Sequence, residues 1–208
     1  MFSPRSIQSN ITFAQKIFSL DYILILSILF LGIISMFAMY SSSTGQFDYY
    51  TKSHISRFSV FFVLFLVLSL VDLRLWYQSS YIFYLLILIL LLMVKYFGLS
   101  ASGSKRWLDL YFINLQPSEL MKIGIIIFLA RYYHRIPAHE VNTFKYLLLP
   151  IFVLLGPVVL VMTQPDLGTA LLIGVSGVLI VWLGGVRLKF FTYLTLLFIA
   201  TAPIAISF

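Results

Sequence analysis

Seven apolar blocks, separated by short polar segments, dominate the pattern along the chain. They run approximately from Tyr22 to Tyr40, Phe58 to Val71, Tyr81 to Gly98, Leu120 to Tyr133, Tyr146 to Met162, Leu167 to Leu183, and Phe190 to Phe208. A helix needs about 20 apolar residues to cross the hydrocarbon core, and fewer when flanking side chains reach the interface. The pattern therefore predicts an all-α, polytopic transmembrane helix bundle with about seven spans. The second and fourth blocks are short, so we expect them to extend into neighbours such as Ser56 and Ser118.

The first 20 residues form a separate, more polar segment. It is too polar to be the apolar region of a signal peptide. Its apolar side chains recur at helical spacing, at Ile7, Ile11, Ala14, Ile17 and Phe18. We expect residues 1–20 to form an interfacial or cytoplasmic segment before the first span. No long polar linker follows, so residues 1–208 are predicted to be a single membrane domain.

Composition agrees with a membrane protein and narrows its partners. Hydrophobic residues make up 61% of the chain and charged residues 10%, far from the mix of a soluble domain. The formal charge of +7 is spread between the apolar blocks, which favours contact with anionic membrane lipids over nucleic acid. Cysteine is absent and the three histidines lack metal-ligand spacing, so neither a metal site nor a cofactor is identified.

The distribution of Lys and Arg predicts the orientation. With seven crossings, one side holds eight: Arg5, Lys16, Arg74, Arg131, Arg135, Lys145, Arg187 and Lys189. The other side holds five: Lys52, Arg57, Lys95, Lys105 and Arg106. This bias places the N-terminus in the cytoplasm and the segments Ser41 to Ser56, Leu99 to Pro117 and Thr163 to Asp166 outside. Retention of positive charge accounts for Arg131 and Arg135, to which we assign no chemistry.

Two of the outward segments end alike, in a Gln-Pro step followed by an acid. One runs from Gln116 to Leu120 and the other from Gln164 to Thr169. They can be simple capped helix starts, with proline in the first turn and Thr163 and Asp166 as a capping box. Alternatively, acids close to membrane depth are costly, and two helix N-termini on one side can hold a phosphate or pyrophosphate.

Further candidate side chains flank these helix starts. Lys122 follows Glu119 by three residues, so the two can pair on one helix face. Inside the bundle the pair is a candidate proton or phosphate site, whereas Lys122 can also simply reach the interface. The segment from Gly103 to Asp109 places Lys105, Arg106 and Trp107 together, either as an ordinary interfacial loop or as a site for phosphate and sugar.

Three motifs together resemble the signatures of the SEDS family (shape, elongation, division and sporulation). They are Gly103 to Trp107, Gln116 to Lys122, and Gln164 to Thr169, in the family's order and spacing. Val71 to Trp76 and Met39 to Ser42 are further echoes, so the resemblance covers nearly the whole chain. The segments Arg106 to Leu110 and Leu129 to Tyr133 are more similar to the RodA branch, which serves cell elongation, than to the FtsW branch, which serves division.

The resemblance implies a peptidoglycan glycosyltransferase that polymerises lipid II, an undecaprenyl-linked precursor, at the inner membrane of a bacterium. It implies a role in cell shape and cell wall biogenesis, with a class B penicillin-binding protein as partner. The positions implied to bind the substrate are Arg106, Trp107, Gln116, Ser118, Glu119, Lys122, Gln164 and Asp166. Family members have about ten spans, and their catalytic Asp is expected beyond Phe208. No catalytic residue is therefore assigned within this chain.

Two other functions remain open. A lipid II flippase would also use intramembrane ions and proline-interrupted helix starts. The chain could also be a non-catalytic, truncated fragment, because an apolar run ends at Phe208 without a polar tail. A flippase would move lipid II without lengthening glycan, which separates the first alternative from a polymerase.

Overall fold

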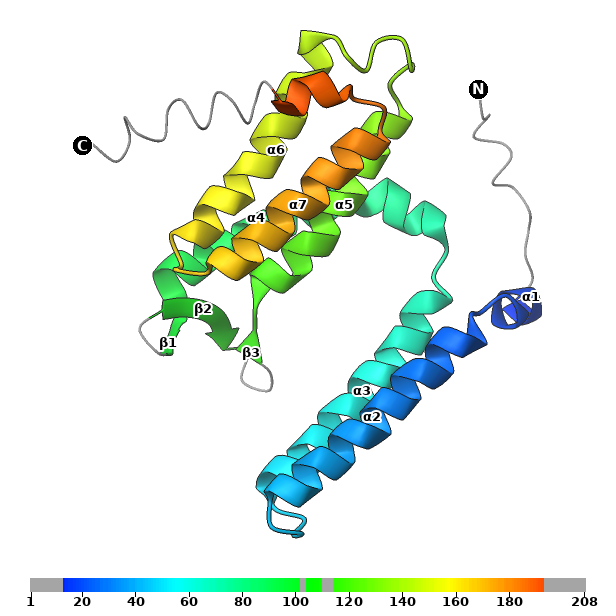
Figure 1. Cartoon of the computed structure of the whole chain (residues 1–208), viewed down its shortest axis with the longest axis vertical. Helices are drawn as coiled ribbons and strands as arrows, with labels where there is room; N and C mark the ends of the chain where they lie inside the picture. The colour runs from blue at the N-terminus through cyan, green and yellow to red at the C-terminus, as the bar shows by residue number, and fades with distance from the viewer. Residues whose placement is uncertain (1–12, 102–103, 110–113, 193–208) are drawn as a thin grey trace. The chain divides into compact units, whose positions relative to one another are not determined.

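The chain is predominantly helical. The computed structural model describes residues 13–101, 104–109 and 114–192 (Figure 1). The chain divides into two compact units, residues 1–72 and residues 73–208, so the single domain expected from the sequence stays a prediction. In chain order the elements are α1 (Phe13–Phe18), α2 (Tyr22–Ser42), α3 (Tyr49–Ser69), α4 (Leu73–Phe97), β1 (Leu99–Ala101), β2 (Ser104–Asp109), β3 (Asn114–Leu115), α5 (Pro117–His134), α6 (Phe144–Met162) and α7 (Leu167–Leu183).

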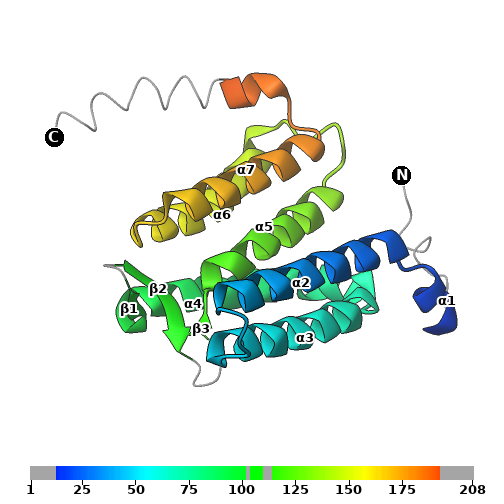
Figure 2. The ribbon, with the colours of Figure 1, turned by 60° about the horizontal axis from the view of Figure 1, so that its bottom comes forward.

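The first unit contains a pair of long helices, α2 and α3, which lie side by side in both views (Figures 1 and 2). Each begins at an aspartate that caps it. Asp21 accepts a hydrogen bond from the backbone N–H of Leu24 at 3.0 Å, and Asp48 accepts one from that of Thr51 at 2.8 Å. A side-chain oxygen at this position satisfies a backbone donor that has no partner within the helix. The aspartates therefore fix where each helix starts.

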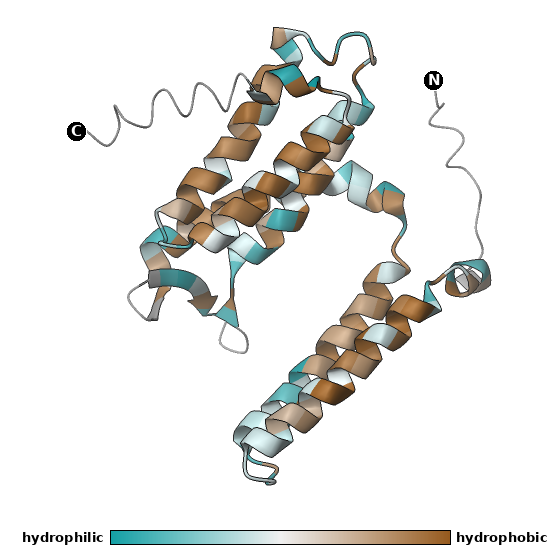
Figure 3. Ribbon diagram, in the orientation of Figure 1, coloured by the Kyte–Doolittle hydropathy of each residue, from teal (hydrophilic) through white to brown (hydrophobic). Residues whose placement is uncertain are grey.

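Helices α2 and α3 approach closely at Gly32. A Cβ atom there would lie 2.0 Å from the ring of Phe58, so only glycine fits without a shift of the ring. Ser35 Oγ and His54 Nε2 lie 2.9 Å apart and form a hydrogen bond between the two helices. Most of the remaining surface of the pair is apolar and exposed (Figure 3), which suits contact with lipid tails.

In the second unit, α5 packs against both α4 and α7, and α7 packs against α6. The fully buried side chains of these helices include Ile87 and Leu91 of α4, Met121, Ile125 and Leu129 of α5, and Ile173 of α7. The three residues of α5 recur every four positions and so lie on one helix face. The apolar packing of this face gives the second unit its core and holds the N-termini of α5 and α7 at a common end.

Helix α6 contains two interior prolines, Pro150 and Pro157, which are both buried. Proline has no backbone N–H, so the carbonyl four residues earlier loses its partner within the helix. Two tyrosine hydroxyls donate to the freed carbonyls: Tyr84 of α4 to Val153 at 2.8 Å, and Tyr132 of α5 to Tyr146 at 3.1 Å. Each proline in α6 is thus matched by a tyrosine from a neighbouring helix.

The segment between α4 and α5, which we expected to be a loop of an all-α protein, contains three short strands. They form an antiparallel sheet in the order β1-β2-β3. Leu99 pairs with Trp107, and Leu108 pairs with Leu115. Leu108 is buried, whereas Lys105 is exposed. The sheet therefore fixes the position of β2 beside the ends of the helices, and with it the position of Arg106.

The expected count of about seven spans is confirmed only in part. Helices α2, α3, α4 and α6 are long and apolar enough to cross a membrane, and α7 is a shorter apolar helix. Helix α5 carries the charged residues Glu119, Lys122 and Arg131, and it is not among these candidate spans. The seventh block lies outside the described residues from position 193 on. The described chain therefore supports four to five candidate spans.

Helix boundaries differ from the apolar blocks at their polar ends. Helix α3 begins at Tyr49, nine positions before Phe58, because the cap at Asp48 starts the helix within a polar stretch. The predicted extension of this block through Ser56 is confirmed. The fourth block extends back to Pro117 and so includes Ser118, as expected. Of the predicted N-terminal interfacial helix, the described part is α1; Ile7 and Ile11 lie outside the described residues.

Candidate functional site

Asp166 caps the N-terminus of α7. Its Oδ1 accepts a hydrogen bond from the backbone N–H of Thr169 at 3.2 Å, and its Oδ2 accepts one from Thr169 Oγ1 at 2.9 Å. The predicted capping box was wrong by one turn, because Thr163 ends α6 and donates to the carbonyl of Leu160. The Asp166 side chain is only 13% exposed, so these contacts hold a largely buried carboxylate.

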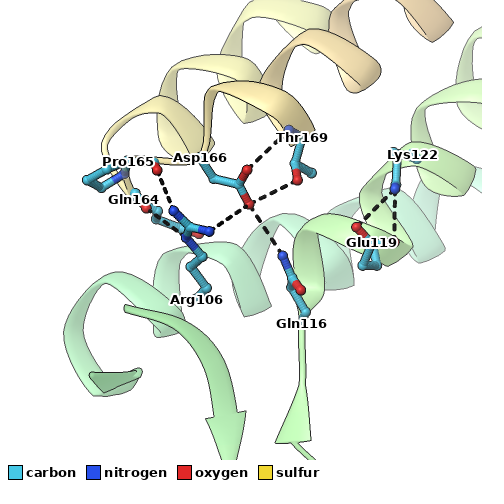
Figure 4. Close-up of polar contacts among 8 residues, drawn as sticks. All are labelled: Arg106, Gln116, Glu119, Lys122, Gln164, Pro165, Asp166 and Thr169. Carbon is cyan, nitrogen blue, oxygen red and sulfur yellow. Dashed lines mark hydrogen bonds and ion pairs between the residues drawn. The ribbon is translucent and has the colours of Figure 1, made fainter. Parts of the chain in front are cut away.

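Gln116 occupies the corresponding position of α5. It is the residue before the helix, and Pro117 fills the first helical position, as the Gln-Pro motif predicted. Its side-chain Nε2 donates to Asp166 Oδ2 at 3.4 Å (Figure 4). The residues that precede α5 and α7 are therefore hydrogen-bonded to each other. This contact brings the N-termini of α5 and α7 together, and a helix N-terminus favours negative charge.

Arg106 reaches this place from strand β2. Its Nε donates to the carbonyl of Gln164 at 3.4 Å, and its Nη2 donates to the carbonyl of Pro165. Its Nη1 lies 3.9 Å from Asp166 Oδ2, so the two side chains form an ion pair (Figure 4). Arg106 thereby binds the turn that leads into α7. Its side chain is 30% exposed.

Two polar side chains near these helix starts are buried. Gln164 is 5% exposed, and its Nε2 donates to the carbonyl of Leu91 on α4 at 3.4 Å. Ser118, in the first turn of α5, is 2% exposed. A buried polar group is costly unless it is hydrogen-bonded, so the contact of Gln164 fixes the turn against α4. We call Arg106, Gln116, Gln164, Asp166 and Thr169 the Asp166 network.

Glu119 and Lys122 form a separate pair on α5, as their spacing predicted. Lys122 Nζ donates to both carboxylate oxygens of Glu119 at 2.9 Å. The Glu119 side chain is 54% exposed and that of Lys122 is 26% exposed, so the pair lies at the surface of the second unit. Figure 4 shows it one turn further along α5 from Gln116. The pair and the Asp166 network thus share the N-terminal end of α5 without a direct contact between the described groups.

Trp107 is the predicted site residue with the least connection to the network. It is half-buried and pairs with Leu99 in the sheet. Leu99 pairs with Trp107 and Ser100 with Lys105, so Arg106 is the extra residue of an irregularity in the pairing of β1 with β2. Of the eight predicted positions, the structure brings Arg106, Gln116, Gln164 and Asp166 into one network.

Thr169 is the member of the network that the sequence analysis did not assign. Its position three residues after an aspartate is typical of a residue whose backbone N–H is capped. The motif from Gln164 to Thr169 carries this signal, whereas the predicted capping box begins at Thr163. Within the described ranges, no cluster of His, Asp or Glu residues has the arrangement of a metal site.

Comparison with known proteins identifies the family. The family described as "Cell cycle protein", which covers FtsW, RodA and SpoVE, matches residues 17–208. The peptidoglycan glycosyltransferase MrdB of Escherichia coli K12 is 33% identical over 195 residues, which are 93% of this chain and 51% of MrdB. The probable peptidoglycan glycosyltransferase FtsW of Buchnera aphidicola subsp. Baizongia pistaciae is 28% identical over 158 residues, 76% of this chain and 42% of that protein.

Solved structures agree with this assignment. The rod shape determining protein RodA of Thermus thermophilus matches with a TM-score of 0.64 and 27% identity, over 86% of this chain and 60% of that one. A chain of a peptidoglycan synthase complex matches with a TM-score of 0.75 and 23% identity, over 89% of this chain and 55% of that one. At this identity the match shows the fold alone. The chain spans about half the length of the curated relatives it matches. It belongs to the SEDS family of multi-pass membrane proteins, which comprises FtsW, RodA and SpoVE.

Proposed function

We propose that this chain supplies the substrate-holding part of a peptidoglycan glycosyltransferase that polymerises lipid II. The observation that carries the proposal is the hydrogen bond between Gln116 and Asp166, which joins the starts of α5 and α7. Two positive helix ends and the partly exposed guanidinium of Arg106 then meet at one place. A pyrophosphate linked to a lipid carries the charge that such a place favours.

Arg106 and Lys122 have different roles in this proposal. Arg106 contacts the substrate through the exposed part of its guanidinium while its other donors hold the turn before α7. Lys122 is paired with the exposed Glu119 and can exchange that partner for a phosphate oxygen. An exposed ion pair contributes little free energy, so this exchange costs little. Trp107 and Ser118 complete the proposed substrate-binding set.

Neither carboxylate of the site is proposed as the general base. A base must be free to accept a proton from the acceptor hydroxyl. Both oxygens of Asp166 already accept hydrogen bonds from Thr169, and Oδ2 accepts another from Gln116. Both oxygens of Glu119 accept from Lys122. We therefore assign Asp166 to positioning and Glu119 to charge balance, with the base supplied elsewhere in the complete enzyme.

The orientation and partner follow from the same proposal. The Lys and Arg bias supports an outward Asp166 network and a cytoplasmic N-terminus. An outward network faces the side on which peptidoglycan is built. We propose a class B penicillin-binding protein as the partner that crosslinks the strands, and cell elongation as the process served. The similarity to MrdB and RodA supports elongation, and the similarity to FtsW proteins supports the shared chemistry.

The test is glycan-strand formation from lipid II. This sequence is placed in a protein of its relatives' full length, together with a class B penicillin-binding protein. We expect Asp166→Ala and Lys122→Ala each to reduce strand formation at least about tenfold, the usual scale for losing a charge-assisted contact. Lys95→Ala is the matched control, because Lys95 is an exposed cation outside the network. Undiminished synthesis by both site variants would overturn the site assignment.

The same preparation separates polymerisation from transport. A flippase in liposomes would move lipid II to the opposite leaflet without lengthening glycan. We expect longer glycan chains to form from lipid II that is already on the outer face. Translocation without chain growth would contradict the proposed function and favour a transporter.

A further inference from the structure

A second polar cluster lies at the other end of α5, away from the Asp166 network. It consists of Arg131 in α5, Arg135 at the C-terminus of α5, and the rings of Tyr77 and Tyr81 in α4. The Cζ atom of Arg131 lies 4.2 Å from the ring centroid of Tyr81 and 5.1 Å from that of Tyr77. The Cζ atom of Arg135 lies 5.7 Å from the Tyr77 centroid and 6.0 Å from the Tyr81 centroid. We call these four residues the tyrosine–arginine cluster.

Hydrogen bonds fix both guanidinium groups in place. Arg131 Nη1 donates to the carbonyl of Gln78 at 2.6 Å and to Ser80 Oγ at 3.3 Å. Arg135 Nε donates to the hydroxyl of Tyr77 at 3.2 Å. These contacts use only some of the donors that each guanidinium carries. The groups are therefore held in one orientation with donors left over.

The cluster carries two positive charges close together. The carboxylates of Asp166, Glu119 and Glu140 pair with Arg106, Lys122 and His139 rather than with Arg131 or Arg135. The buried Nε of Arg131 also has no hydrogen-bond partner among the described residues. Two like charges share one pair of rings, and the ring faces offset only part of their repulsion. An anion beside them would complete the arrangement.

Retention of positive charge on one side of the membrane does not require this geometry. That effect depends on how many Lys and Arg residues flank the spans, whatever their contacts. Lys189, at the same end of the unit, adds to this positive charge as an ordinary exposed side chain. The stacking and hydrogen bonding of Arg131 and Arg135 therefore point to a ligand.

We propose that the tyrosine–arginine cluster binds the phosphate of an anionic phospholipid head group at the membrane surface opposite the Asp166 network. Its place at the ends of α4 and α5 puts it at head-group level, where tyrosine rings and basic side chains gather. A guanidinium matches phosphate oxygens with two parallel hydrogen bonds. Arg135 is exposed and Arg131 is half-buried, so the head group enters beside Arg135. This inference is independent of the proposed function.

The test compares lipid binding by the whole chain in nanodiscs that contain phosphatidylglycerol or only phosphatidylcholine. Native mass spectrometry counts the lipids retained after release from the nanodisc. The variant Arg131→Gln/Arg135→Gln removes two charges from the cluster. The control, Arg187→Gln/Lys189→Gln, removes two exposed charges from the same end of the second unit. Single Arg135→Gln is included because Arg131 also holds α4, and its loss can affect folding.

We expect the cluster variant to retain at least about fivefold less phosphatidylglycerol than the control, because only the cluster holds its guanidinium groups oriented for charge-assisted hydrogen bonds to a phosphate. Arg135→Gln should give an intermediate loss with unchanged helix content. Equal losses in cluster and control variants would overturn the proposal in favour of general charge. Displacement of the lipid by millimolar inorganic phosphate would overturn it in favour of a soluble anion.

Discussion

At the scale of single residues, the candidate site depends on how one carboxylate is held. Asp166 accepts hydrogen bonds from Gln116 and from the backbone and hydroxyl of Thr169, and it faces Arg106. The Asp166 side chain is only 13% exposed, and burying a charge costs free energy unless it is paired and hydrogen-bonded. Each of these contacts therefore helps to offset that cost. The carboxylate therefore serves to order the donors around it.

Thr169 offers the cleanest test of that positioning role. Thr169→Val removes the hydroxyl that donates to Asp166 at 2.9 Å and keeps the backbone N–H and the side-chain shape. We expect lipid II binding to weaken about fivefold, the effect of about 1 kcal/mol for one lost hydrogen bond. Thr169→Ser retains the donor and should restore affinity. The measurement is the lipid II dissociation constant in nanodiscs; equal affinity of all three proteins would contradict the role.

Asp48 provides a pH-dependent cap in the first unit. The hydrogen bond from the Thr51 backbone N–H lowers the pKa of Asp48 below its ordinary value. A lowered pKa means that the cap stabilises α3 above the ordinary carboxyl pKa and is lost as pH falls through the folded pKa. We expect hydrogen exchange in the first turn of α3 to accelerate below about pH 4, near the ordinary aspartate pKa.

Asp48→Asn is the matched control for this effect. Asparagine also accepts the capping hydrogen bond but does not titrate. Exchange in the first turn of α3 should then be independent of pH after correction for intrinsic rates. A pH dependence that persists in Asp48→Asn would assign it to another group.

At the scale of elements, α6 depends on its neighbours for its own backbone hydrogen bonding. A proline inside a transmembrane helix leaves a carbonyl that needs another donor. Tyr84 and Tyr132 supply donors to the carbonyls freed by Pro157 and Pro150. The tyrosines thereby join the middle and the start of α6 to α4 and α5.

A double-mutant cycle tests this link. Tyr84→Phe leaves the Val153 carbonyl without a donor and should destabilise the protein by about 1 kcal/mol. Pro157→Ala restores the N–H that the helix lacks at this position, so Tyr84→Phe should cost much less in that background. The measurement is unfolding in mixed detergent. Additive effects of the two substitutions would contradict the link.

The second proline supplies the control for the cycle. Tyr132 donates to the carbonyl freed by Pro150, not to the one freed by Pro157. We therefore expect Tyr132→Phe and Pro157→Ala to be additive.

At the scale of the whole molecule, apolar pattern located six helices but not all of their ends. Helix α3 starts in a polar stretch because Asp48 caps it, and apolarity carries no information about that cap. Strands β1, β2 and β3 are short and lack a clear alternation of apolar and polar residues, so the apolar pattern alone does not predict them. The family, in contrast, could be identified from motifs in the sequence and is confirmed.

The candidate site was predicted as a set of residues rather than as an arrangement. The repeated Gln-Pro-acid motif indicated that two helix starts share one end, and the contact of Gln116 with Asp166 agrees. The distances that bring Arg106 to the carbonyls of Gln164 and Pro165 depend on the sheet and on the packing of α4, α5 and α7. Contacts between residues so far apart in sequence require the folded chain.

The most direct measurement of the central claim is the affinity of this chain for lipid II after loss of Arg106. Arg106→Gln removes the guanidinium at the two helix starts, and Lys105→Gln removes the neighbouring exposed cation of β2. With binding of fluorescent lipid II in nanodiscs as the readout, we predict at least about tenfold weaker binding for Arg106→Gln. Lys105→Gln should remain within about twofold of the unmodified chain, as for other exposed charges. Equal affinities of the two variants would contradict the account.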